Sequence, residues 1–215
     1  NKAQTTGVDN INKVSIPAES AVKQKASANI DDVAKAAKRA IDNTNGITES
    51  EKKAAKGQVD ADAQAAKQAI GQAKSNKAVT DAVNNGTVAI NKEAANAAID
   101  GALAEKNNSI DEAPNLTDEE KQSVKDQAKK AADNAKTAIS TASTVTAVES
   151  AKNTGVQTIK NMTIPTVSAV KQKASANIDD VAKAAKQAID NTKGLTNSEK
   201  EAAKSQVDTD AKAAK

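Results

Sequence analysis

The stretch SAVKQKASANIDDVAKAAK at residues 20–38 occurs again without a single change at residues 168–186. The register continues beyond the identical segment, because Gln-Val-Asp at residues 58–60 returns at residues 206–208, at the same offset of 148 positions. Self-similarity over such a long period is typical of a tandem array, in which each unit buries its apolar face partly against its neighbours. The sequence therefore predicts a repeat protein.

A weaker copy lies between the two identical stretches. The motif Ile/Leu-Thr-x-x-Glu-Lys begins at Ile47, again at Leu116 and again at Leu195, so the spacings are 69 and then 79 positions. The spacings give a unit of about 70 to 80 residues. Each copy of this short motif is a reference point from which the rest of the unit can be aligned.

Helix start signals occur within each copy of the motif. Thr48, Thr117 and Thr196 are each followed three positions later by Glu, which is the pattern of a capping box at a helix N-terminus. Residue types that tolerate the left-handed conformation at the end of a helix stand just upstream: Gly46, Asn115 and Gly194. The high charge and low hydrophobicity would also allow disorder, but a disordered chain has no use for repeated stop and start signals. A folded helical protein is therefore predicted.

Apolar residues spaced by three and four positions predict three helices in the first full unit, at residues 20–44, 48–74 and 76–91. The expected stripes are Val22, Ala26, Ile30, Val33, Ala37 and Ile41; Ala55, Val59, Ala63, Ala66, Ile70 and Ala73; and Val79, Val83, Gly86 and Ile90. Short connections make consecutive helices antiparallel. Most stripe positions are Ala, which contributes about 0.8 kcal/mol against about 1.5 to 3 kcal/mol for a large aliphatic residue, so the core is expected to be thin. Exposed pairs within helices should add about 0.2 to 0.5 kcal/mol each: Asp31 with Lys35, Glu49 with Lys53, and Asp126 with Lys130.

Two kinds of joint between units are expected. Pro17 and Pro165 lie in inserts of about ten residues, and proline ends a helix because it lacks the N–H and clashes with the preceding turn. The insert is missing between Ile90 and Ile99, where the chain has neither Pro nor Gly. The third helix of one unit should therefore continue into the first helix of the next, as one helix of about 35 residues over residues 76–112.

The predicted fold class is all-α, with tandem three-helix bundles stacked end to end into an elongated rod and one helix shared between units. The expected domains are the end of a preceding repeat with a Pro-containing joint at 1–19, helical repeat units at 20–91 and 92–160, a Pro-containing joint at 161–167, and a partial unit at 168–215. On this interpretation the sequence is cut in mid-repeat at both ends.

The composition removes several classes of function. The chain has no His, no Cys and no aromatic residue, so imidazole and thiolate catalysis, zinc or copper ligation by nitrogen or sulfur, and base stacking are unavailable. The 31 basic and 28 acidic residues are interspersed, which argues against binding to nucleic acid. No apolar run is long enough to insert into a membrane. We therefore expect a monomer that is not an enzyme, with no catalytic residues, cofactor site or metal site.

Three sets of polar residues are weaker candidates for a site. Paired carboxylates could bind Ca²⁺ or act as acid and base, but no EF-hand pattern surrounds them, which favours plain surface charge. An Asn-Asn-Gly run could be a binding loop, although close helix packing or a kink is favoured. A Lys-rich face could meet anionic polymers or lipid, but acidic neighbours favour an ordinary solvated face. The sets are Asp31, Asp32, Glu119, Glu120, Asp179 and Asp180; residues 84–86; and Lys23, Lys25, Lys35 and Lys38.

These motifs in this order resemble a known family. A helix ending in Gly, a Leu/Ile-Thr-x-x-Glu-Lys start, a Val-Asp pair at 59–60 and 207–208, and Asn-Asn-Gly-x-x-x-Ile ending at Ile90 are similar to a helical repeat of unknown function. That repeat is arrayed in giant cell-wall-anchored surface proteins of Gram-positive bacteria, of the extracellular-matrix-binding type. The resemblance covers essentially the whole chain, although the middle unit has Gln-Ala-Lys at 127–129 in place of Val-Asp and lacks the Pro-containing joint. It implies an extracellular stalk with roles in adhesion and aggregation, and no catalytic residues.

Two classes of function follow. The first is a structural spacer or stalk of a cell-surface adhesin, which projects a binding region away from the cell wall. The alternative is a weak, multivalent adhesion or aggregation module that binds a host matrix protein or like arrays. Against this alternative, the chain lacks the large exposed apolar or aromatic anchors that binding hot spots need. An enzyme is not supported, because no nucleophile and base can be paired.

Overall fold

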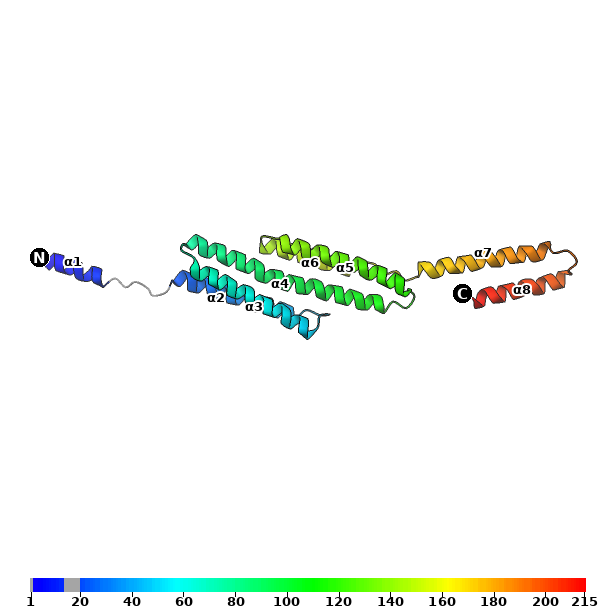
Figure 1. Ribbon diagram of the computed structural model, residues 1–215, viewed down its shortest axis with the longest axis horizontal. Coiled ribbons are helices and arrows are strands. Elements are labelled where there is room, and N and C mark those ends of the chain that lie inside the picture. Colours follow the sequence, from blue (N-terminus) through cyan, green and yellow to red (C-terminus); the bar gives the residue numbers. More distant parts are fainter. Residues whose placement is uncertain (1, 14–19) are drawn as a thin grey trace. The chain divides into compact units, whose positions relative to one another are not determined.

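The computed structural model describes residues 2–13 and 20–215, and in this part of the chain all regular structure is helical (Figure 1). The helices are α1 (Lys2–Asn12), α2 (Ala21–Asp42), α3 (Glu49–Gln72), α4 (Asn76–Asp111), α5 (Asp118–Thr141), α6 (Val145–Lys160), α7 (Ala169–Asn191) and α8 (Asn197–Ala213). The predicted all-α fold class is confirmed. The first Pro-containing joint, with Pro17, lies outside the described residues.

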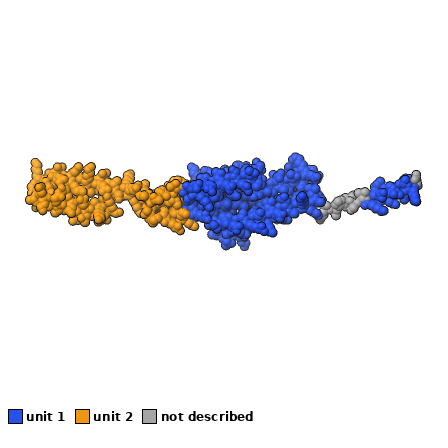
Figure 2. Space-filling model, turned by 180° about the vertical axis from the view of Figure 1, so that it is seen from behind, with its two compact units in different colours: residues 1–107, 128–162 blue, residues 108–127, 163–215 orange. Residues whose placement is uncertain are grey.

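The chain divides into two compact units (Figure 2). One unit contains residues 1–107 and 128–162, and the other contains residues 108–127 and 163–215. Helices α4 and α5 each contribute to both units, so the units cut across the sequence repeats.

The first three-helix bundle is built from α2, α3 and the first part of α4. Its core has a few fully buried large side chains, namely Ile30, Ile41, Val59, Ile70 and Ile90. Alanines fill most of the remaining core positions, as the stripes predicted. The core is therefore thin, with close helix contacts made possible by small side chains.

Val22 is an exception to the predicted stripe, because 46% of its surface is exposed. Its neighbour Lys23 already reaches the end of α3, where Nζ donates a hydrogen bond to the carbonyl oxygen of Gly71 at 2.7 Å. Val22 thus lies at the end of the bundle, where α3 no longer covers it. The spacing of apolar residues correctly predicted the buried face of α2, but it does not show where the partner helix α3 ends.

The second bundle combines the later part of α4 with α5 and α6. Ile99, Ile139, Val148 and Ile159 form its buried centre, again with alanines between them. This core and the first one belong to the same compact unit. The second bundle therefore repeats the construction of the first with a helix that both of them use.

Helix α4 confirms the predicted continuous joint, because it runs for 36 residues without a break. Around the middle of α4, residues of the two cores are interspersed: Ile90 and Ala97 pack in the first, while Ala95 and Ile99 pack in the second. The two bundles therefore overlap along α4, so that neighbouring turns of one helix serve both.

A glycine contact fixes this overlap. Gly101 in α4 lies directly against the turn between α2 and α3, so that an added Cβ would overlap the carbonyl oxygen of Asn45. Gly46 in that turn has a φ of 84°, and a Cβ there would lie 2.7 Å from the carbonyl oxygen of Gly101. Two glycines thus let backbone approach backbone where the turn of one repeat meets the helix of the next.

The predicted left-handed backbone is confirmed at two of three positions, although it lies in the turn after the helix end, since the C-caps of α2 and α7 are Asn43 and Thr192. Gly46 and Gly194 are left-handed, with φ of 84° and 88°. Asn115 is not, since no residue other than glycine has a positive φ in the described ranges. Pro114 already prevents continuation of α4, and the Asn115 side chain instead donates a hydrogen bond from Nδ2 to the carbonyl oxygen of Thr166 at 3.0 Å.

Candidate functional site

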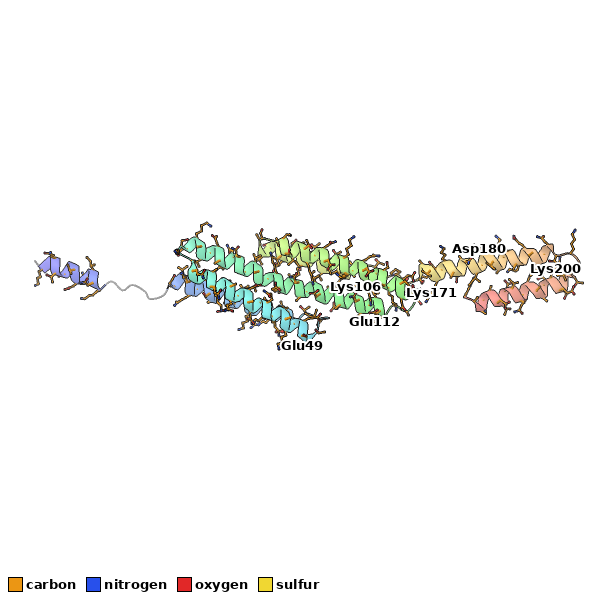
Figure 3. All side chains as sticks on the ribbon, viewed as in Figure 1. Glu49, Lys106, Glu112, Lys171, Asp180 and Lys200 are labelled. Atoms are coloured by element: carbon orange, nitrogen blue, oxygen red, sulfur yellow. The ribbon has the colours of Figure 1, made fainter. Side chains whose placement is uncertain are left out.

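Each repeat joins its first two helices with the same pair of lysines, which we call the hairpin clasp. The first lysine donates from Nζ to the last-turn carbonyl oxygen of an aspartate in the preceding helix: Lys52 to Asp42 (3.0 Å), Lys121 to Asp111 (2.9 Å) and Lys200 to Asp190 (2.8 Å). The second lysine, one turn later, pairs with the carboxylate of the same aspartate: Lys56 with Asp42 (2.5 Å), Lys125 with Asp111 (2.6 Å) and Lys204 with Asp190 (3.0 Å). Figure 3 shows Lys200 at the start of α8, beside the turn. An ammonium at the negative end of a helix is favourable, so the clasp stabilises each hairpin locally.

A second set of ion pairs joins the helices further along. The partners are Asp31 with Lys67 (2.7 Å), Asp100 with Lys136 (2.5 Å), and Asp179 with Lys215. These contacts correct the predicted pairs within helices, because Asp31 pairs across to α3 rather than with Lys35. Likewise Glu49 pairs with Lys52. The same antiparallel geometry recurs in every repeat, and it brings the oppositely charged groups of two helices together.

Three of the candidate polar residues are part of this framework. Asp31 and Asp179 belong to the interhelical pairs, and Lys38 pairs with Asp60. Asp180 projects from α7 and is exposed (Figure 3). Across residues 2–13 and 20–215, the structure has no group of three or more carboxylates placed to hold a metal ion. Nor does any helix in these ranges have the length and apolar character needed to cross a bilayer.

The most specific repeated geometry is the groove between the first two helices of a repeat, which we call the third-helix seat. In the first repeat Gly86 of α4 lies in it, so close to α3 that an added Cβ would overlap the Ala66 side chain and approach Ile30 Cδ1 to 3.2 Å. The residues Asn84 and Asn85 are on the same helix, not in a loop. Gly86 therefore serves close helix packing, as the sequence favoured.

The second repeat contains the same arrangement. Gly155 of α6 lies against Ala135, where a Cβ would overlap the alanine methyl, and against Ile99, whose Cδ1 would be 2.7 Å away. Ile99 and Ala135 stand 69 positions after Ile30 and Ala66, so these are equivalent residues. In both repeats, therefore, a glycine on the third helix packs against an Ile and an Ala of the first two helices.

The joint between the second and third repeats has a feature that the sequence did not reveal. Glu120 is the capping-box residue of α5, and its Oε2 accepts the Thr117 N–H at 3.0 Å. Its other oxygen, Oε1, accepts the Val170 N–H at 3.2 Å, from the first turn of α7. Ser168, the N-cap of α7, is 1% exposed and also hydrogen-bonds to this carboxylate. One side chain therefore caps two helices that are 50 residues apart in the sequence.

These hydrogen bonds determine the charge state of Glu120. The backbone hydrogen bond from Thr117, followed by the bond from Ser168, lowers the pKa of Glu120 from 4.5 to about 2. Glu51 and Glu199 are the equivalent residues of the other capping boxes, and their pKa values are also lowered, by hydrogen bonds from Thr48 and Thr196 respectively. Of these three glutamates, Glu120 is the one that also accepts hydrogen bonds from the first turn of the following repeat, within the described residues. It remains a carboxylate well into the acid range.

The family assignment agrees with the repeats seen in the structure. A model of a family described as a domain of unknown function, DUF1542, matches the chain three times in tandem, at residues 22–92, 91–167 and 170–215. The chain belongs to the DUF1542 family. The family is known from cell-surface proteins, and its description carries no catalytic assignment. Comparisons with curated proteins and with solved structures gave no significant match.

Proposed function

We propose that this DUF1542 chain is a length of stalk whose function is to hold other parts of a surface protein at a distance. The observation that carries the proposal is α4, because one unbroken helix of 36 residues belongs to the cores of two successive repeats. A joint of this kind has no linker in which the chain can bend freely. At a joint of this kind, a repeat adds length without adding a flexible connection.

The proposal extends to the location and the partners of the chain, with the family as its support. We place the chain outside the cell, as part of a cell-wall-anchored adhesin of a Gram-positive bacterium, with a host matrix protein or like arrays as possible contacts of the whole protein. A surface of small residues and mixed charge supports a spacer better than a receptor, because it has no aromatic anchors. Binding by a single repeat should therefore be weak, in the micromolar to millimolar range.

Small-angle scattering on the full chain tests the stalk. We expect a maximum dimension above roughly 100 Å, because successive repeats extend the chain along helices that rise about 1.5 Å per residue. A compact chain of this length would have a radius of gyration of about 17 Å. A measured value near that compact figure would rule out the stalk.

A binding measurement separates the stalk from the adhesion module. The full chain is immobilised and titrated with fibronectin, albumin and immunoglobulin at physiological salt. Weak, non-saturating signals are expected. Saturable nanomolar binding that one substitution abolishes would replace the stalk with a dedicated receptor-binding module.

A further inference from the structure

The sequence Asn-Gly occurs twice in the chain, in two different backbone settings. One pair, at residues 45–46, lies in the turn between α2 and α3, and the other, at residues 85–86, lies within α4. In such a pair the amide carbon of the asparagine side chain is close to the next backbone nitrogen, and glycine has no side chain to shield that nitrogen. The nitrogen can attack the amide carbon if the local backbone leaves it free to do so.

The pair in the turn has both reacting groups free. Asn45 is exposed, and Gly46 lies outside the helices with a φ of 84°. Among the residues that the structure describes, neither the Gly46 N–H nor the Asn45 side-chain amide has a hydrogen-bond partner. The contact of this turn with α4 involves the carbonyl oxygen of Asn45 and leaves its side chain exposed. No helical hydrogen bond therefore has to break before the reaction.

The pair in α4 is protected by its helix. Asn85 is exposed as well, but Gly86 is buried in α4 and lies against Ala66. An N–H inside an α-helix donates to the carbonyl oxygen four residues earlier, which fixes the backbone nitrogen in place. Attack on Asn85 must therefore wait for local opening of α4. The same dipeptide in the same molecule thus provides an internal reference.

We propose that Asn45 is a site of spontaneous deamidation in the folded chain. The Gly46 nitrogen forms a bond to Cγ of Asn45, and the bond from Cγ to the side-chain nitrogen breaks. That nitrogen leaves as ammonia, with the proton of the Gly46 N–H. Water then opens the succinimide ring at either carbonyl carbon, supplying the hydroxyl of a new carboxyl group and the proton of the restored N–H. One opening gives aspartate, and the other gives isoaspartate, in which the main chain runs through the former side chain.

The isoaspartate product changes the contact between the first and second repeats. It adds one carbon to the main chain where the Asn45 carbonyl oxygen lies against Gly101, with no room for a Cβ. A lengthened turn cannot keep such a close contact between two backbones. The change is confined to the first repeat, because the equivalents of Asn45 are Pro114 and Lys193. It goes beyond the stalk role and does not depend on it: as the protein ages, this turn loosens from α4.

The test is incubation of the full chain at physiological temperature, at neutral and at mildly alkaline pH. Trypsin digestion under mildly acidic conditions then places the two pairs in separate peptides, residues 40–52 and 78–92. By mass spectrometry, the 40–52 peptide should gain the mass difference between an amide and a carboxyl group, at Asn45. The gain should be faster at the higher pH, because the attacking nitrogen must lose its proton.

The 78–92 peptide is the internal control. It should change at least about tenfold more slowly, a ratio that corresponds to about 1.4 kcal/mol for opening α4. In concentrated urea the two peptides should change at similar rates, because the helix no longer protects Gly86. Equal rates in the folded chain would overturn the proposal, as would a 40–52 peptide that stays unmodified.

Two variants test the site and its consequence. Asn45→Gln should stop the gain in the 40–52 peptide, because attack would have to close a larger ring, whereas Asn85→Gln should leave that gain unchanged. Asn45→Asp carries the new charge without the extra backbone carbon. The isoaspartate form, separated from the aged chain by anion exchange, should unfold at a lower temperature than freshly prepared Asn45→Asp. Continued gain at this site in Asn45→Gln would refute the assignment, and equal unfolding temperatures would refute the loosened turn.

Discussion

The joint between the first and second repeats and the joint between the second and third repeats are built in opposite ways. Between the first and second repeats, α4 continues through the joint, and its neighbouring turns belong to two cores. Between the second and third repeats, α6 ends at Lys160 and α7 begins at Ala169, and the segment between them contains Pro165. This second joint is held by hydrogen bonds to the Glu120 carboxylate.

The difference shows two ways of fixing successive repeats. A continuous helix resists bending through its backbone hydrogen bonds and through apolar packing, neither of which depends on pH. The Pro-containing joint is held by the Glu120 carboxylate and by the hydrogen bond from Asn115 to Thr166, so part of its strength follows the protonation of Glu120. Five predictions test this contrast.

The largest effect is expected from Ala95→Pro, in the middle of α4. Ala95 is 2% exposed and lies in the second core, so proline would remove a helix hydrogen bond and disturb the packing of both bundles. The free energy of unfolding should fall by about 3 kcal/mol or more. Urea unfolding followed by far-ultraviolet circular dichroism measures this change.

The matched control is Asp118→Pro, at the first position of α5. Proline is tolerated there because the N–H of the first helical residue has no partner within the helix. A loss as large as that of Ala95→Pro would show that proline acts through something other than helix continuity.

A smaller effect is expected from Gly101→Ala, where α4 meets the turn of the first repeat. The added methyl would overlap Asn45, so stability should fall by about 1 to 3 kcal/mol. Gly57→Ala, at an open helical position, should instead raise stability by about 0.5 to 1 kcal/mol. Thermal unfolding of the pair gives the comparison, and equal shifts of the same sign would contradict the close contact at Gly101.

Glu120→Gln should affect only the Pro-containing joint. Because the chain has no Cys, spin labels can be attached to cysteines placed at the equivalent exposed positions Gln58, Gln127 and Gln206. Electron–electron distance measurements should show a broader 127–206 distribution in the Gln variant and an unchanged 58–127 distribution. Broadening of both would mean that Glu120 holds the whole chain rather than one joint.

The same labels test the pH dependence. The folded pKa of Glu120, about 2, is below its ordinary value of 4.5, so its contribution to stability is complete above pH 4.5 and is lost as the pH falls toward 2. The 127–206 distribution should widen in this window in the unmodified chain more than in Glu120→Gln. The 58–127 distribution provides the internal control.

The smallest effect is expected from Pro165→Ala. Pro165 is exposed and lies outside the helices, so the free energy of unfolding should change by no more than about 0.5 kcal/mol. The same urea titration measures it. A loss comparable with that of Ala95→Pro would show that the two joints are equivalent after all.

Much of this contrast could be predicted from the sequence, because it depends on local signals. The absence of Pro and Gly between Ile90 and Ile99 predicted α4, which ends at Asp111, one residue from the expected end. The Thr-x-x-Glu pattern predicted three capping boxes, and all three form. Each of these signals acts within a few residues along the chain, so periodicity and helix capping are enough to identify it.

The remaining features depend on residues that are distant in sequence. Glu120 was identified only as a cap and as one of a carboxylate pair, since nothing near it shows that Val170 and Ser168 lie beside it. Asp31 was paired with Lys35 on its own helix, whereas the register of α2 against α3 gives it Lys67. Repetition would have helped with Asp31, because the Asp–Lys spacing of 36 residues occurs in all three repeats.

The shared helix also changes what counts as one unfolding unit. In an array whose repeats only abut, stability is the sum of a term for each repeat and a term for each interface. Here α4 cannot unfold in the first repeat without exposing the core of the second, so these two repeats should unfold together as one cooperative block. In an array built with this pattern, the proline inserts, rather than the repeat length, would set the size of each block.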